Sequence, residues 1–178
     1  MKIKSLNENI VVPEGNEIFI NDRILKIKGP KGELTRKFSE PLIGINVENH
    51  QVIIKSLARS LKKKDKRNFR TVRAHIRNMI NGVNKGYVYK LKVCSGHFPI
   101  TVNIEGNSLV VKNFLGEKVP RRLKFEGVKV SVDGDIISVS GNDKELVGNT
   151  SAGIERLTKI KGRDRRIFQD GCYIISKE

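Results

Sequence analysis

The sequence of 178 residues contains only two cysteines, no tryptophan, and aromatic residues at just 6% of its positions. Cys94 and Cys172 stand in no paired spacing, which excludes a disulfide scaffold and a cysteine-built zinc site and favours a reducing compartment. No apolar run approaches the roughly 18–20 residues that span a bilayer. Residues 1–9 also lack the apolar stretch of a secretory leader, so we expect neither a membrane span nor a leader.

Acidic residues are scarce relative to basic ones. The chain has 35 Lys and Arg against 19 Asp and Glu, a formal net charge of +16. Residues 55–77 alone hold ten basic side chains and one acidic side chain, Asp65. Such a run can be a solvated surface, but so many like charges repel one another unless phosphates or another counter-charge neutralise them. We therefore expect a polyanionic partner, with nucleic acid first among them.

Three segments recur in the same order, which indicates an internal duplication rather than chance similarity between two amphipathic halves. The matched segments are residues 25–33 with 109–117, 47–54 with 132–139, and 74–79 with 152–157. The offset between the copies shrinks along the chain from 84–85 residues to 78. The first copy therefore has about seven extra residues, a basic insertion around 58–68 that we expect between its last strand and its helix.

Alternating apolar residues predict half-buried strands in both copies. We expect these strands near residues 25–27, 34–38, 45–47, 52–54, 100–104, 109–111, 128–132 and 137–139. Short turns rich in Gly, Asn and Asp join them, and no helix-length segment separates consecutive strands, so the sheets are expected to be antiparallel.

One amphipathic helix closes each copy. Apolar residues spaced three and four apart from Phe69 to Val83 predict the first helix. A capping box beginning at Asn142 predicts the second, in which Gly148 and Gly153 mean either a break or a neighbour too close for a Cβ. The sequence thus predicts an α+β protein with two tandem homologous domains, residues 1–86 and 87–178, each an antiparallel β-sheet packed against an α-helix.

Nothing in the sequence supports catalysis. The three histidines, His50, His75 and His97, lie on separate segments without metal-ligand spacing, and structural or surface roles suit them best. Residues 29–32 (Gly-Pro-Lys-Gly) resemble a phosphate loop only faintly, because they join two strands and lack the GK[ST] ending, so we interpret them as a hairpin with a basic tip. We expect buried, inert thiols, no metal, no cofactor and no small-molecule substrate.

Two further basic segments occur in the second copy, residues 112–122 with four cations and 159–166 with five. Each could be no more than a solubilising surface. Because no aromatic motif suited to stacking single-stranded bases appears, folded RNA contacted through its shape and backbone is the expected ligand.

Several short motifs, in their shared order, resemble the large-ribosomal-subunit protein family called L-six in bacteria and L-nine in eukaryotes, in its archaeal and eukaryotic form. They include residues 11–14 (VVPE), 27–32 (IKGPKG), 78–83 (NMINGV), 97–100 (HFPI), 113–118 (NFLGEK) and 163–171 (RDRRIFQDG). The resemblance implies a structural protein of the cytoplasmic ribosome that binds rRNA near the sarcin–ricin loop, with ribosomal proteins near the stalk base as neighbours.

The resemblance also implies that the second domain is the main rRNA anchor. Its expected contact residues are Lys112, Asn113, Lys118, Arg121, Arg122, Lys161, Arg163, Arg165 and Arg166. The charge map adds a second set in the first domain, which would meet further rRNA or an acidic protein neighbour: Lys62, Lys63, Lys64, Arg70, Arg73 and Arg77. A transient RNA-binding assembly factor is the alternative function, and an RNA-modifying enzyme lacks the cofactor loop or acid–base pair it would need.

Overall fold

The structure, a computed structural model, describes residues 6–48, 50–58, 61–164 and 166–178. The chain divides into two compact units, Met1–Gly86 and Tyr87–Glu178. Within the described ranges every strand pair is antiparallel, and each unit has one α-helix, α1 (Lys63–Asn84) or α2 (Lys144–Leu157). The predicted α+β class and the duplicated sheet-plus-helix plan are confirmed.

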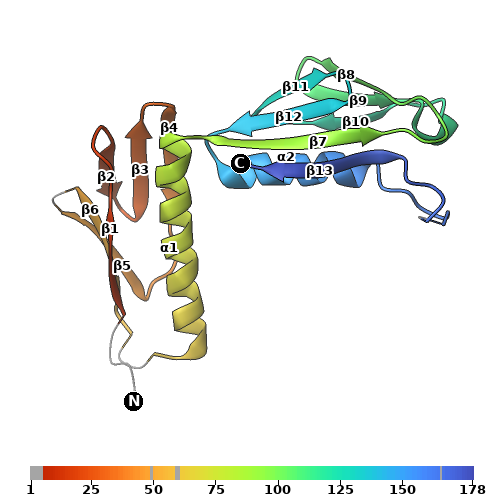
Figure 1. The fold of residues 1–178 in the computed structure, drawn as a ribbon. Coiled ribbons are helices and arrows are strands. Elements are labelled where there is room, and N and C mark those ends of the chain that lie inside the picture. The colour runs from red at the N-terminus through yellow and green to blue at the C-terminus, as the bar shows by residue number, and fades with distance from the viewer. Residues whose placement is uncertain (1–5, 49, 59–60, 165) are drawn as a thin grey trace. The chain divides into compact units, whose positions relative to one another are not determined.

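The first unit places α1 against two three-stranded sheets (Figure 1). Their strands are β1 (Asn7–Val11), β2 (Glu17–Asn21), β3 (Ile24–Gly29), β4 (Gly32–Lys37), β5 (Ile43–Glu48) and β6 (Gln51–Ser56). The sheet orders are β1-β6-β5 and β2-β3-β4. Fully buried Leu25, Ile27, Val52 and Ile54 face the apolar stripe of α1, as the period-two pattern predicts. The strands β1 and β2 had no counterpart among the predicted segments.

The helix α1 begins earlier than predicted. Lys63 is already helical, and the backbone N–H of Lys62 donates to Oδ2 of Asp65 at 3.0 Å, which closes the first turn. Six residues separate β6 from α1, against two between the last strand and the helix of the second copy, and residues 63–66 of the basic run belong to the first turns of α1. The predicted basic insertion around 58–68 therefore falls partly before the helix and partly within it. The helix α1 has 22 residues, against 14 in α2.

The basic tip of the β3–β4 hairpin ends α1. A Cβ on Gly29 would lie 2.9 Å from Cγ2 of Val83 and 2.5 Å from Oδ1 of Asn16, so only glycine allows this close approach. The backbone N–H of Lys31 donates to the carbonyl of Val83 at 2.9 Å, and its ammonium group donates to the carbonyl of Lys85. The tip thus satisfies carbonyls that a helix end leaves unpaired, and no phosphate role is needed to explain it.

The second unit holds a four-stranded and a three-stranded sheet, with α2 against β7, β12, β13 and β10 (Figure 1). Its strands are β7 (Tyr87–Cys94), β8 (Thr101–Glu105), β9 (Ser108–Lys112), β10 (Arg121–Lys124), β11 (Lys129–Asp133), β12 (Ile136–Gly141) and β13 (Gly171–Lys177). The orders are β11-β12-β7-β13 and β10-β9-β8. Because β13 pairs with β7, Gly171 lies opposite Cys94, and the segment before β13 meets the segment after β7.

The helix α2 is continuous through both of its glycines. A Cβ on Gly153 would lie 3.1 Å from Cδ2 of Leu123 on β10, which explains the glycine by close packing. Gly148 has only an ordinary contact, 3.9 Å to the ring of Tyr89, so packing does not explain it. The predicted cap is displaced by one residue: the side chain of Asp143, not Asn142, accepts a hydrogen bond from the backbone N–H of Glu145 at 2.8 Å.

No helix in the described part of the chain is both long enough and apolar enough to span a membrane.

Candidate nucleic-acid interface

The loop between β9 and β10 has a fixed backbone shape. Asn113 and Leu115 adopt positive φ angles of 58° and 52°, which turn the chain tightly around the short 3₁₀ helix η1 (Phe114–Gly116). Phe114 is buried in the core, and the guanidinium carbon of Arg121 lies 4.3 Å from the centroid of its ring. The loop is therefore a rigid support for Lys118, whose exposed ammonium group has no ion pair with a described residue.

The other three cations of this loop region pair with carboxylates. The Nζ of Lys112 lies 3.6 Å, and Nη1 of Arg122 3.0 Å, from the carboxylate of Glu105 on β8. The Nε of Arg121 donates to Oε2 of Glu117 at 2.8 Å, and this contact holds the pKa of the Glu117 carboxyl below its usual value. Exposed pairs of this kind add little stability, but they orient the guanidinium groups.

Arg121 also connects the loop to α2. Its Nη1 donates to the carbonyl of Leu157 at 2.6 Å, at the end of the helix. A cation at a helix C-terminus satisfies an unpaired carbonyl and interacts favourably with the helix dipole. Arg121 is thus a structural residue of the interface, and its guanidinium is already occupied by three protein groups.

A buried carboxylate joins two further segments. Asp170 is completely buried, and its Oδ1 accepts hydrogen bonds from the backbone N–H groups of Gly96 at 2.6 Å and His97 at 3.0 Å. Its Oδ2 lies 2.8 Å from Nδ1 of His97. Burial by itself would raise the pKa of Asp170, but the hydrogen bonds from His97 and Gly96 outweigh it and hold the pKa below its usual value.

His97 continues this connection as a stack of rings. Its imidazole lies on the ring of Phe168, with centroids 4.5 Å apart and planes inclined by 26°. The guanidinium carbon of Arg163 lies 4.8 Å from the centroid of the same phenyl ring. Arg163 is therefore held by a cation–π contact and has no acidic partner among the described residues, which leaves its charge available to a ligand.

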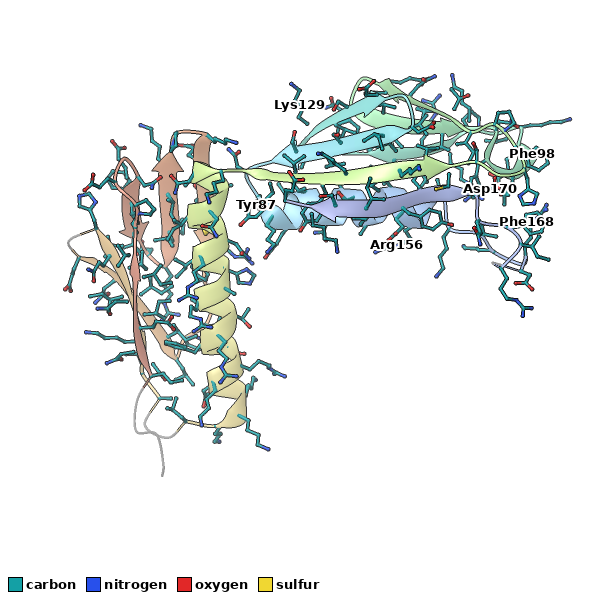
Figure 2. All side chains as sticks on the ribbon, in the orientation of Figure 1. Tyr87, Phe98, Lys129, Arg156, Phe168 and Asp170 are labelled. Atoms are coloured by element: carbon teal, nitrogen blue, oxygen red, sulfur yellow. The ribbon has the colours of Figure 1, made fainter. Side chains whose placement is uncertain are left out.

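The loop of residues 113–120 also contacts the segment that contains His97. The side-chain amide of Asn113 donates to the carbonyl of Pro99 at 3.0 Å, and a Cβ on Gly116 would lie 3.4 Å from the ring of Phe98. Residues 95–99, residues 113–120, and residues 161–164 with 166–170 thus meet at one end of the second unit, where Figure 2 labels Phe98, Phe168 and Asp170. We call these three segments the loop cluster.

The C-terminal cations differ in their surroundings. Lys161 is exposed and has no ion pair with a described residue. The Nη2 of Arg166 lies 2.7 Å from Oδ2 of Asp164, and its hydrogen bonds lower the pKa of that carboxyl. Arg165, which was also predicted to bind rRNA, lies outside the described residues. The loop cluster thus brings together Asn113, Lys118, Lys161, Arg163 and Arg166, with Lys112, Arg121 and Arg122 on the adjoining strands.

The predicted cations of the first unit do not gather at one point. Arg73 and Arg77 both reach Glu8 of β1, at 3.0 Å and 2.8 Å. Arg70 turns instead into a shallow groove of about 570 Å³ along α1, together with Lys63 and other helix residues. Lys62, Lys63 and Lys64 stand at the N-terminal end of α1, where the helix dipole is also positive. Their charges are therefore not offset by the helix, and a polyanion or acidic protein surface fits this end.

Sequence reasoning missed the residues that organise the loop cluster. Asp170 and His97 are 73 residues apart, and only the pairing of β13 with β7 brings them together. His97 was expected to have a packing role, which its stack on Phe168 confirms. The motifs around both residues were visible, but no spacing connected them.

No group of three or more His, Cys, Asp or Glu side chains placed to hold a metal occurs in the part of the chain that the structure describes. Cys172 is buried, and burial raises the pKa of its thiol to about 11, so it is the inert thiol that was predicted. Cys94 is half-buried and free.

Comparison with known proteins gives matches over nearly the whole chain. The family model described as ribosomal protein L6 matches residues 12–86 and again residues 98–171. A protein of Methanobrevibacter smithii named large ribosomal subunit protein uL6 is 48% identical over 176 residues, which cover 98% of this chain and 97% of the relative. The protein of the same name from Sulfurisphaera tokodaii is 44% identical, covering 100% of this chain and 96% of the relative.

Proposed function

The chain belongs to the ribosomal protein L6 family, and from that premise we propose that the loop cluster of its second unit anchors it to rRNA. As a member of this family it is a structural protein of the large ribosomal subunit in the cytoplasm, and not an enzyme. Ribosomal RNA and neighbouring ribosomal proteins are its partners. What the family leaves to be assigned is which surface of this chain meets the RNA.

The single observation that supports the loop cluster is its rigidity combined with uncompensated charge. Buried Asp170 fixes two of its segments, and the hydrogen bond from Asn113 to Pro99 fixes the third. Lys118, Lys161 and Arg163 then present positive charge without an acidic partner in the described chain. A rigid cationic surface of this kind suits the phosphates and 2′-hydroxyls of folded RNA, since its groups lose little freedom on binding.

We propose further that the anchor lies near the sarcin–ricin loop and the translation-factor region, with proteins of the stalk base as neighbours. The support for this placement is family membership and the resemblance of the loop motifs, above all residues 113–118 and 163–171. The groove and N-terminal end of α1 would meet additional rRNA or an acidic protein neighbour, because Lys63, Lys64 and Arg70 have no acidic partner among the described residues.

Charge reversal within the second unit tests the proposed anchor. Lys118→Glu with Lys161→Glu removes two exposed cations of the loop cluster that have no ion pair within the described chain, while Lys124→Glu with Lys129→Glu makes the same change of charge elsewhere in the unit. Figure 2 shows Lys129 away from the end that carries Phe98 and Phe168. We expect the first pair to reduce retention on salt-washed large subunits at least fivefold and the second pair to change it little, since phosphate contacts dominate salt-dependent affinity.

Equal losses for the two pairs would contradict the placement of the anchor. Loss of the wild-type protein in the same salt wash would instead favour a transient assembly factor. Both measurements use quantitative mass spectrometry of pelleted subunits, with another large-subunit protein as the internal standard.

A further inference from the structure

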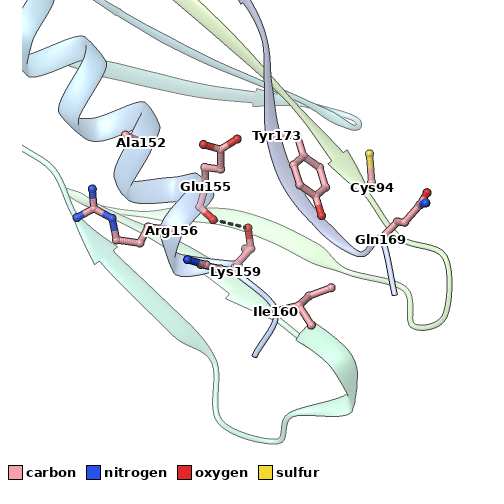
Figure 3. A pocket seen from close by; sticks show the side chains of 9 residues that line it. Cys94, Ala152, Glu155, Arg156, Lys159, Ile160, Gln169 and Tyr173 are labelled. Carbon is pink, nitrogen blue, oxygen red and sulfur yellow. Dashed lines mark hydrogen bonds between the residues drawn. The ribbon is translucent and has the colours of Figure 1, made fainter. Parts of the chain in front are cut away.

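The second unit contains a cavity of about 790 Å³ beside the C-terminal end of α2 (Figure 3). Its lining comes from the end of β7, the last turns of α2 with the residues that follow, the segment that leads into β13, and β13 itself. This volume lies within the range of about 300–1,000 Å³ that is usual for sites holding small organic groups. None of the rRNA contacts proposed above uses this cavity.

One wall of the cavity is a fixed aromatic ring. The hydroxyl of Tyr173 donates to the carbonyl of Asp170 at 3.3 Å, which holds the ring beside Cys94 and Ile160. Figure 3 shows Tyr173, Gln169 and Ile160 bordering the same space. A flat ring with small apolar neighbours is a platform on which any nucleobase can stack.

The rim of the cavity is cationic. Arg156 and Lys159 are exposed, and neither forms an ion pair with a residue in the described ranges. Glu155 and Gln169 add a carboxylate and an amide, groups that hydrogen-bond the edge of a base. The rim is also continuous in sequence with the loop cluster, because Lys159 directly precedes the basic segment that carries Lys161.

We propose that this cavity receives one unstacked nucleotide of the bound RNA. The base lies against Tyr173, and its phosphates lie at Arg156 and Lys159. Because the carboxylate of Glu155 only accepts hydrogen bonds, a base with an exocyclic amino group fits better than uracil. The inference rests on the proposed function, since docking of RNA on the loop cluster brings the nucleotide to the cavity.

The test uses large subunits that carry the full-length protein and chemical probing of rRNA bases at nucleotide resolution. Ala152→Phe adds a ring to the cavity wall and leaves every charged side chain in place. Asn149→Phe makes a similar addition at an exposed position of α2 outside the cavity lining. With dimethyl sulfate for adenine and cytosine and a glyoxal for guanine, we expect one base to become at least fivefold more reactive in Ala152→Phe subunits than in wild-type or Asn149→Phe subunits.

A second pair of variants, at Tyr173, controls for a folding defect. Tyr173→Ala removes the stacking ring and should expose the same base, whereas Tyr173→Phe keeps the ring, although without its hydrogen bond to Asp170, and should expose that base much less. If these proteins remain on salt-washed subunits and no base changes, or if Asn149→Phe gives the same change as Ala152→Phe, the inference is overturned while the proposed function stands. If wild-type protein itself is lost in the salt wash, the proposed function fails first.

Discussion

The two repeats use the same hairpin for different purposes. In the first unit, Pro30 and Lys31 alone join β3 to β4, and this tip sits on the end of α1 with a 2.9 Å hydrogen bond to Val83. In the second unit, the equivalent strands β9 and β10 are joined by residues 113–120, which project Lys118. One copy thus uses the connection to complete its helix, and the other lengthens it into an exposed cationic loop.

The two helices differ in length as well, but here the first unit has the longer element. The helix α1 has 22 residues and carries its cations along its own length, whereas α2 has 14 residues and ends beside the cavity. The cores that the helices cover are built alike, from fully buried aliphatic residues on matched strands and helix faces. The duplication therefore preserves the core, and the charged residues proposed to contact rRNA lie where the copies diverge.

The largest expected difference between the units arises from substitutions in their two cores. Ile76 and Ile154 occupy equivalent helix positions and are both completely buried. Truncation of either to alanine should cost about 2–5 kcal/mol of unfolding free energy, because each leaves a cavity in a closed core. Hydrogen exchange followed by mass spectrometry should show lost protection within the unit that carries the substitution.

Cys172 provides an independent measurement of this prediction. Burial raises the pKa of its thiol to about 11, so at pH 8 only on the order of a thousandth is thiolate and labelling by iodoacetamide requires opening of the second unit. In a Cys94→Ser background, Ile154→Ala should accelerate labelling, and Ile76→Ala should leave it near the wild-type rate. Equal acceleration by both would show that the repeats do not open separately.

A smaller effect should distinguish the second unit from the first at low pH. The hydrogen bonds to Asp170 lower its pKa in the folded state, so their stabilisation is fully present above its unfolded pKa, near 4, and is lost as the pH falls through the lower folded value. Asp170→Asn should cost about 1.5–3 kcal/mol at pH 7, because it removes a charged acceptor from a buried site. Hydrogen exchange in residues 95–99 and 166–170 gives the readout.

The Asp170→Asn variant also tests the expected pH dependence. The wild-type segments should lose protection as the pH falls below about 4, while Asp170→Asn should already be less protected at pH 7 and respond less to acid. An unchanged acid response in Asp170→Asn would assign the pH dependence to other carboxyls and would remove Asp170 as the residue that organises the loop cluster.

The core could be predicted from the sequence because period-two and helical patterns are local. The alternation at Leu25 and Ile27, and the stripe from Phe69 to Val83, each lie within one element and were interpreted correctly. The strand β1 was missed because its only apolar residues, Ile10 and Val11, are adjacent, so the sequence shows no apolar alternation there. The start of α1 was missed because a run of lysines gives no apolar stripe, although Asp65 was available to close its first turn.

The charged residues of the candidate interface could be predicted from the sequence, but the contacts that arrange them could not. The cations of residues 112–122 and 161–166 stand out in the sequence, yet nothing local distinguishes Arg122, which forms an ion pair, from Lys118, which forms none with a described residue. That difference arises because β8 places Glu105 next to Arg122, a contact across strands. Likewise, the role of Asp170 depends on the pairing of β7 with β13, which a sequence pattern does not specify.

The smallest effect compares the cations that end the two helices. Lys31→Ala should cost no more than about 0.5 kcal/mol, because the backbone hydrogen bond to Val83 survives and the lost contact of the ammonium group with the carbonyl of Lys85 is exposed. Arg121→Ala should cost about 1–2 kcal/mol, because it removes the hydrogen bond to Leu157 and uncovers the ring of Phe114. Thermal unfolding by circular dichroism measures both, with Arg121→Lys as an intermediate control that keeps the charge but not the planar fork. If Lys31→Ala proved the more costly, the tip of the first hairpin would depend on its side chain more than on its backbone, and the two repeats would end their helices in the same way after all.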